Sequence, residues 1–167
     1  MNKELLQKAA KSLVPAGVLL RSTKVDTHPE FHRQMEQPEN LQVQYRARHL
    51  NEYKLMLTEE ENQGIMAFFF EASIRLVDDS IDEKDDAFVK VEIVATFASE
   101  YILSNANDFD EDAMSEFLNH NVQHHIWPYW REYVQSTCAR MGLPAVPVPH
   151  QFYSASASGK KVDKKRG

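Results

Sequence analysis

Residues 126–152, with the sequence IWPYWREYVQSTCARMGLPAVPVPHQF, constrain the fold of this chain more than any other segment. The apolar residues of the first part recur at helical spacing, which predicts an amphipathic helix that stops at Met141 and Gly142. Prolines then alternate with apolar residues as far as Pro149. Because proline lacks a backbone N–H, this second part cannot pair fully in a sheet. We expect an extended arm, partly of polyproline type, that lies over an apolar surface.

Length and composition predict one globular domain. The chain has 167 residues, of which 43% are apolar and 26% charged, as is ordinary for a domain with a hydrophobic core. The last eight residues, KKVDKKRG, hold five of the 19 basic side chains and one of the 25 acidic ones, so the rest of the chain has a net charge of −10. A strongly acidic body argues against nucleic acid as a partner.

Three further observations favour a cytoplasmic protein. No run of about 18 apolar residues is present, so we expect no membrane-spanning helix and no membrane partner. The first residues, Met1 to Glu4, lack the basic and apolar regions of a secretory signal peptide. The single cysteine, Cys138, excludes an internal disulfide framework and suits a reducing compartment.

The pattern of apolar residues predicts one helix followed by four strands. Residues 2–13 have helical spacing, and Pro15 and Gly17 should end this first helix. Residues 18–25 indicate a short strand, and residues 26–40 a long crossing loop. Alternation of apolar and polar side chains predicts further strands at residues 41–48, 65–77 and 88–103. Short polar links between these strands favour an antiparallel sheet.

A long helix and a polar tail complete the predicted plan. Acidic residues at 108–112 mark the start of the helix, in which Pro128 either restarts or kinks the backbone. Residues 154–167 are rich first in Ser and Ala and then in Lys, which predicts a disordered basic tail. The chain thus divides into an additional N-terminal helix at residues 1–17, a central domain at residues 18–153 and the tail.

No set of residues in the sequence predicts catalysis. Glu116, His120 and His124 lie four residues apart on one helix face, which is compatible with zinc, but no HExxH motif or cysteine pair accompanies them. Gly-rich phosphate loops and nucleophile motifs are missing, and Cys138 lies in an apolar helix with no base that can be placed beside it. We therefore predict no enzymatic activity, no catalytic residue, no metal and no cofactor.

Large aromatic side chains occupy both faces of one predicted strand. Phe68 and Phe70 point to one face, and Phe69 points to the other. A single-layer sheet in a monomer would leave one of these faces exposed. The alternatives are an interface between copies of the chain and a groove for apolar segments of other proteins.

The order of the predicted elements and several motifs resemble the SecB family of export chaperones. The strongest matches are the run IWPYWRE at residues 126–132, the helix exit RMGLP at residues 140–144, and the proline-rich arm as far as Phe152. The tripeptide QPE at residues 37–39, before the second strand, adds to them. The resemblance extends over about residues 18–152.

The resemblance implies an α+β protomer with a four-stranded antiparallel sheet and a long C-terminal helix packed at an oligomer interface. Protomers of this family pair into an eight-stranded sheet, and two such dimers pack through their long helices into a homotetramer. Unfolded or precursor polypeptides bind in apolar grooves, for export or to protect one client such as the antitoxin of a toxin–antitoxin pair. We therefore predict an ATP-independent chaperone, a holdase, that binds by apolar contact.

Apolar residues on elements without an obvious cover within the chain are the predicted client-binding residues. They come from the crossing loop, the second strand, the long helix and the arm: Phe31, Met35, Leu41, Val43, Tyr45, Trp127, Val146, Val148 and Phe152. The apolar face of the long helix supplies the predicted oligomer interface: Ile126, Trp130, Tyr133, Val134 and Met141. Because Trp127 and Trp130 lie only about 60° apart around the helix, these two assignments are interchangeable.

The chain departs from the family in three places. It has the additional N-terminal helix, it lacks a second helix after the arm, and it carries residues Leu20 to Lys24 where export members have acidic ones. The second departure predicts a more open groove. The third leaves no clear site for SecA, the translocation motor to which export members dock. The competing hypothesis is a dedicated adaptor or inhibitor that binds one folded partner.

Overall fold

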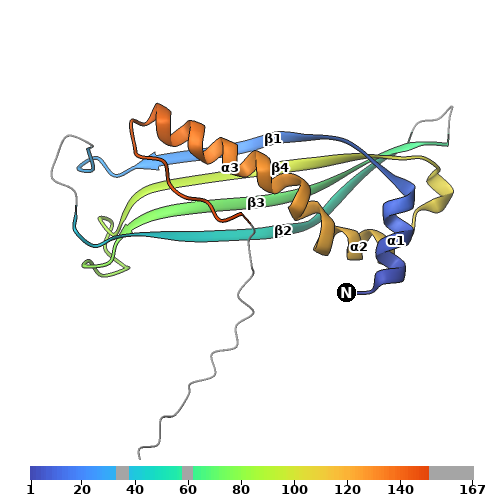
Figure 1. Cartoon of the computed structure of the whole chain (residues 1–167), viewed down its shortest axis with the longest axis horizontal. Helices are drawn as coiled ribbons and strands as arrows, with labels where there is room; N and C mark the ends of the chain where they lie inside the picture. The colour runs from blue at the N-terminus through green and yellow to red at the C-terminus, as the bar shows by residue number, and fades with distance from the viewer. Residues whose placement is uncertain (33–37, 58–61, 151–167) are drawn as a thin grey trace, which may run out of the picture.

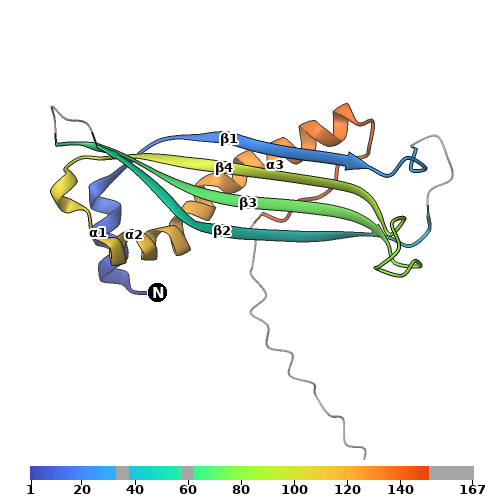
Figure 2. The ribbon, with the colours of Figure 1, turned by 180° about the vertical axis from the view of Figure 1, so that it is seen from behind.

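An antiparallel sheet of four strands forms the centre of the structure, a computed structural model that describes residues 1–32, 38–57 and 62–150. Its strands follow the order β1-β4-β3-β2: β1 is Leu13–Thr27, β2 is Leu41–Leu57, β3 is Gly64–Asp78 and β4 is Val89–Leu103. The helices lie on one face (Figure 1), and no described element covers the other, bare face (Figure 2). The predicted α+β fold with a four-stranded antiparallel sheet is confirmed.

In the described part of the chain, five helical segments form the second layer. They are α1 (Lys3–Ser12), the 3-10 turn η1 (Ala106–Asp108), α2 (Glu111–Phe117), the π-helical turn η2 (Leu118–Val122) and α3 (Gln123–Arg140). Asp110 caps α2 by accepting a hydrogen bond from the Ala113 N–H at 3.0 Å, within the acidic run that predicted a helix start. Pro128 lies inside α3 and does not restart the helix. Within the described residues, no helix is both long and apolar enough to cross a bilayer.

The first strand begins five residues earlier than the sequence pattern predicted. Pro15 and Gly17, which we expected to end the first helix, lie inside β1 and pair with Tyr101 and Glu100 of β4. Proline is tolerated in β1 because this strand lies at the edge of the sheet and pairs on one side alone. A register shift between Pro15 and Gly17 accommodates the irregularity.

The second strand continues to Leu57, well beyond the predicted end at residue 48. The polar residues Asn51 and Glu52 interrupt the alternation that marked the strand. The register with β3 shifts between Leu50 and Tyr53, so a bulge absorbs the interruption and pairing resumes.

Aromatic rings from the sheet and α3 form the core. Phe68 and Phe70 are buried on the helix-covered face, and Phe69 points to the bare face, as the alternation predicted. Phe97 of β4 meets Trp130 of α3 edge to face, with the ring centroids 6.5 Å apart. Since such pairs are favourable beyond their burial, they hold α3 against the chain's own sheet.

The structure corrects part of the expected oligomer interface. Ile126, Trp130 and Val134 are buried in the core of a single chain, because the apolar face of α3 packs on its own sheet. Tyr133 and Met141 are half-buried against the same core, and the Tyr133 hydroxyl is hydrogen-bonded to that of Thr23 in β1. An amphipathic pattern shows that a face is covered, but it does not show whether the same chain or another copy covers it.

Candidate functional site

After α3 the chain turns sharply and returns over the helix-covered face as an extended segment, residues 143–150, which we call the strap. Gly142 makes the turn, with a φ of 70° in the left-handed region that favours glycine. Its N–H donates to the Ala139 carbonyl at 3.1 Å, and the Leu143 N–H donates to the Cys138 carbonyl at 2.9 Å. The strap then runs between α3 and β2 (Figure 1). The helix end thus directs the proline-rich segment across the sheet.

Two side chains tether the strap by the carbonyl groups of its prolines. The Tyr45 hydroxyl of β2 donates to the carbonyl oxygen of Pro147. The indole Nε1–H of Trp127 in α3 donates to the carbonyl oxygen of Pro149 at 2.7 Å. Val148 lies between these prolines and is buried in the core. Because proline keeps its carbonyl acceptor, the strap is held without strand pairing.

An apolar cavity of about 290 Å³ lies between the strap and the sheet. Its walls come from four parts of the chain: Phe31 of the crossing loop, Leu41 and Val43 of β2, Leu76 of β3, and the strap from Leu143 to Pro147. All of these side chains are apolar. Cavities near 300 Å³ with walls of this kind are of the size that binds small organic ligands or a few side chains of a peptide.

The seven described members of the predicted client-binding set have three different placements. Four of them line the cavity: Phe31, Leu41, Val43 and Val146. Two others, Tyr45 and Trp127, tether the strap, and the seventh, Val148, belongs to the strap and is buried in the core. The remaining two predicted residues, Met35 and Phe152, lie outside the described residues.

Sequence reasoning missed part of the cavity wall. Leu76 stands opposite Val43 in the register of β2 and β3, so correct pairing of these two strands would have found it. The other missed residues belong to the strap: Leu143, Pro144, Ala145 and Pro147. The proline pattern predicted an arm over an apolar surface, but an extended segment has no fixed periodicity that would show which of its side chains face inwards.

We expect Tyr45→Phe to loosen the strap without unfolding the domain. The substitution removes the hydroxyl that donates to Pro147 and keeps the ring. Since a side-chain hydrogen bond contributes about 1 kcal/mol, the strap should open about fivefold more often. The rate at which a thiol reagent labels a cysteine placed at the buried position 148 (Val148→Cys, Cys138→Ala background) measures this opening. Labelling at the parent rate would show that Trp127 and packing alone hold the strap.

The histidines of the long helix make separate contacts. His120 Nε2 lies 3.1 Å from a carboxylate oxygen of Glu116, and His125 Nδ1 lies 2.6 Å from the Tyr101 hydroxyl. Burial raises the pKa of Tyr101 to about 12, so this hydroxyl keeps its proton at neutral pH. No group of three metal-ligating side chains forms anywhere in the described part of the chain.

His49 of β2 should make the stability of the fold depend on pH. Its ring meets Phe70 edge to face at 5.1 Å, and its buried Nδ1 has no hydrogen-bond partner among the described residues. Burial, and to a smaller extent the nearby His120, lowers the pKa of His49. The unfolded chain therefore binds a proton more readily below about pH 6.5, the ordinary pKa of histidine. This part of the stability is present above that pH and is lost as the pH falls below it.

We expect His49→Phe to flatten the decline of the unfolding free energy between about pH 7 and pH 5. Urea unfolding at several pH values measures this decline, with His124→Gln, a change at an exposed position, as the control. Equal pH dependence in the parent and the His49→Phe variant would assign the decline to other groups.

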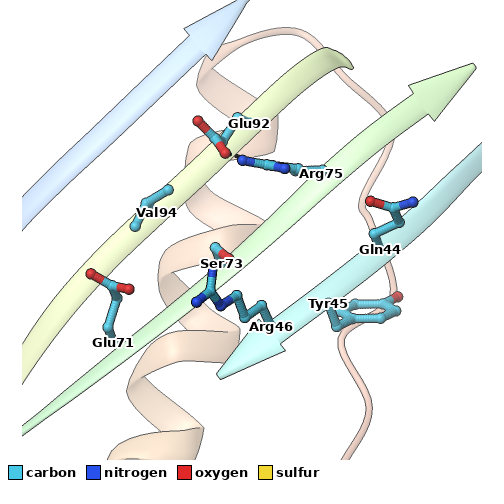
Figure 3. A pocket seen from close by; sticks show the side chains of 8 residues that line it. All are labelled: Gln44, Tyr45, Arg46, Glu71, Ser73, Arg75, Glu92 and Val94. Atoms are coloured by element: carbon cyan, nitrogen blue, oxygen red, sulfur yellow. Dashed lines mark hydrogen bonds and ion pairs between the residues drawn. The ribbon is translucent and has the colours of Figure 1, made fainter. Parts of the chain in front are cut away.

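A second hollow, which is polar, lies on the opposite, bare face of the sheet (Figure 3). Its lining comes from three strands: Gln44, Tyr45, Arg46, Glu71, Ser73, Arg75, Glu92 and Val94. Arg75 pairs with Glu92 at 2.6 Å, and Arg48, just outside the hollow, pairs with Glu71 at 2.7 Å. The two carboxylates of this hollow thus have arginine partners from neighbouring strands.

Comparison with solved structures identifies the fold. The Rv1957 SecB-like chaperone of Mycobacterium tuberculosis, solved in complex with a ChAD peptide from the Rv1956 HigA1 antitoxin, matches this chain with a TM-score of 0.62. The match covers 90% of this chain and 98% of that chain, at 14% sequence identity. No protein-family model and no curated protein matches the sequence. The resemblance seen in the motifs is confirmed at the level of the fold: this chain has the fold of the SecB-like chaperones.

Proposed function

We propose that this chain is an ATP-independent holdase that binds unfolded polypeptide in the apolar cavity between the strap and β2. The observation that carries the proposal is the convergence of four separate segments on a cavity whose lining side chains are all apolar. Apolar contact is non-directional, so it suits clients of many sequences and requires neither a catalytic group nor a nucleotide. We therefore assign the protein to the chaperones and not to the enzymes.

The size of the cavity sets the expected affinity. Each large apolar side chain that a client buries contributes about 1.5–3 kcal/mol. A client that inserts two or three such side chains gains several kcal/mol, from which the ordering of its backbone subtracts. We expect binding in the micromolar range for a single groove, and tighter binding when one client spans the grooves of several protomers.

We propose an extended polypeptide in the cytoplasm as the client. The SecB-like chaperone of the same fold was solved with a peptide from an antitoxin. An antitoxin or a precursor protein awaiting export fits the same apolar chemistry. Arg21 and Lys24 lie on β1 where export members have acidic residues, which argues against docking to SecA. This favours an antitoxin as the client over a precursor protein awaiting export.

We propose further that protomers join through β1 and assemble into a tetramer. The outer edge of β1 offers unpaired backbone groups along 15 residues. Leu20 and Val25, on the helix-covered side of this strand, are 46% and 39% exposed. Pairing of two β1 strands would continue the sheet across both protomers, and packing of two such dimers through their helix layers gives a tetramer. A monomer mass by light scattering at micromolar concentration would reject this assembly.

Suppression of aggregation tests the proposed activity. An unfolded model protein is diluted from denaturant with and without the chaperone, in the absence of nucleotide, and light scattering follows aggregation. We expect the chaperone to slow aggregation in proportion to its concentration, and several unrelated unfolded proteins to compete with one another for it. Binding of one folded protein that no unfolded competitor displaces would favour the dedicated adaptor instead.

A further inference from the structure

The bare face of the sheet carries two rows of apolar side chains that each cross all four strands. The first row is Val14, Ile102, Ile65 and Met56, and the second row is Leu19, Ala98, Phe69 and Leu50. Five of these side chains are 36–51% exposed: Val14, Leu19, Met56, Ile65 and Ile102. Exposed rows of apolar side chains of this kind are typical of a surface that contacts another protein.

A single row with two opposite charges separates the apolar rows. It consists of Gly17 on β1, Glu100 on β4, Ala67 on β3 and Lys54 on β2. Neither charged side chain forms an ion pair within the described residues, and Lys54 lies over the Phe69 ring at 5.9 Å. A Cβ atom added at Gly17 would meet nothing within 4 Å, so the space above this residue is open.

We propose that this surface packs against the same surface of a second copy of this chain. A two-fold axis that runs parallel to the strands, between β3 and β4, stacks each row on itself in reverse order. Ile102 then faces Ile65 of the second copy, and Lys54 lies over Gly17 of the second copy, where the space is open. Exposed apolar side chains therefore meet apolar ones in the first row, and the long lysine side chain meets an open position in the charged row.

Under the same two-fold symmetry, the charged side chains of one copy lie near opposite charges of the second copy. Gly17 is paired with Glu100 on the neighbouring strand. When Lys54 lies over Gly17 of the second copy, its ammonium group therefore reaches Glu100 of that copy. The two-fold axis repeats this ion pair, so each interface contains two. The separation of Lys54 and Glu100 by one strand within a chain is what allows both pairs to form between chains.

The charged half of the bare face limits the contact. The same symmetry would set Lys24 against Arg46 of the second copy, which are like charges. Three rows about 7 Å apart on four strands about 4.8 Å apart give a contact of about 20 Å by 20 Å. This is roughly half of the standard interface area of about 800 Å² per partner, so the pairing should be weak and concentration-dependent. The cavity and the strap lie on the opposite face and stay free.

Charge reversal tests the pairing. In the proposed tetramer both bare faces point outward, so tetramers can add to one another in both directions. Sedimentation velocity from about 1 to about 100 µM should therefore show assemblies larger than the tetramer that grow with concentration. Lys54→Glu and Glu100→Lys should each weaken this association at least tenfold. The Lys54→Glu, Glu100→Lys double variant should recover the parent dissociation constant to within about threefold, since it restores both pairs with the charges exchanged.

Two results would overturn the proposal. One is a parent mass that stays constant over this range, and the other is a double variant that associates no better than the single variants. Ile102→Asp is a further test, because an acid at the centre of the first row should abolish this association. If Ile102→Asp instead leaves the mass unchanged and reduces protection of unfolded clients, the surface binds polypeptide and not a second copy.

Discussion

We expect Phe31→Asp combined with Leu41→Asp to abolish protection of unfolded clients while the fold persists. Both side chains line the apolar cavity and are only half-buried, so the substitutions disturb the wall more than the core. Loss of two large apolar contacts, each worth about 1.5–3 kcal/mol, together with a charge facing the client, should lower affinity at least tenfold. Aggregation suppression and fluorescence binding of an unfolded client measure the loss, and circular dichroism verifies the fold.

Leu57→Asp is the control for the cavity variant. Leu57 is 59% exposed at the end of β2 and does not line the cavity, so the substitution introduces an acid in place of an apolar side chain outside the proposed site. We expect this control to protect clients as well as the parent does. Full protection by the Phe31→Asp, Leu41→Asp variant would place client binding elsewhere on the molecule.

We expect Trp130→Ala to destabilise each protomer by about 3–5 kcal/mol. Trp130 is 1% exposed, meets Phe97 edge to face and stacks on Tyr133 with the ring centroids 6.3 Å apart. The substitution removes the largest buried side chain that holds α3 on the sheet. For a chain of this size the melting temperature should fall by about 10 °C or more.

A variant at the neighbouring exposed position, Tyr129, distinguishes a core role of Trp130 from an interface role. Tyr129→Ala should change the unfolding free energy by no more than about 0.5 kcal/mol. Thermal and urea unfolding of both variants give the comparison. If Trp130→Ala instead splits an oligomer into folded protomers of parent stability, the indole belongs to an interface and not to the core.

Alternation of side chains was sufficient to predict the sheet. The faces of Phe68, Phe69 and Phe70 follow directly from the period of a strand, and the antiparallel order follows from short links. The ends of the strands were harder to predict, because Asn51 and Glu52 interrupt the alternation while the backbone of β2 continues through a bulge. An edge position also admits Pro15, which would be excluded from a central strand.

Sequence patterns predicted which segments form the candidate site, but not how the side chains of these segments are arranged in it. The composition of the crossing loop, the second strand and the arm identified four of the apolar residues that line the cavity. The roles of Tyr45 and Trp127 depend on hydrogen bonds to Pro147 and Pro149, more than 20 residues distant in sequence, which no local pattern encodes. The distinction between a covered and a free face of α3 likewise depends on tertiary packing.

Site-specific photocrosslinking tests directly whether clients occupy the cavity. A photoreactive phenylalanine analogue replaces Phe31 in the cavity wall and, in a second protein, Ser73 on the bare face. Each is irradiated with the same unfolded client, and mass spectrometry maps the adducts. The holdase proposal predicts abundant client adducts from position 31 and few from position 73. Equal yields from the two positions, or adducts from position 73 alone, would contradict it.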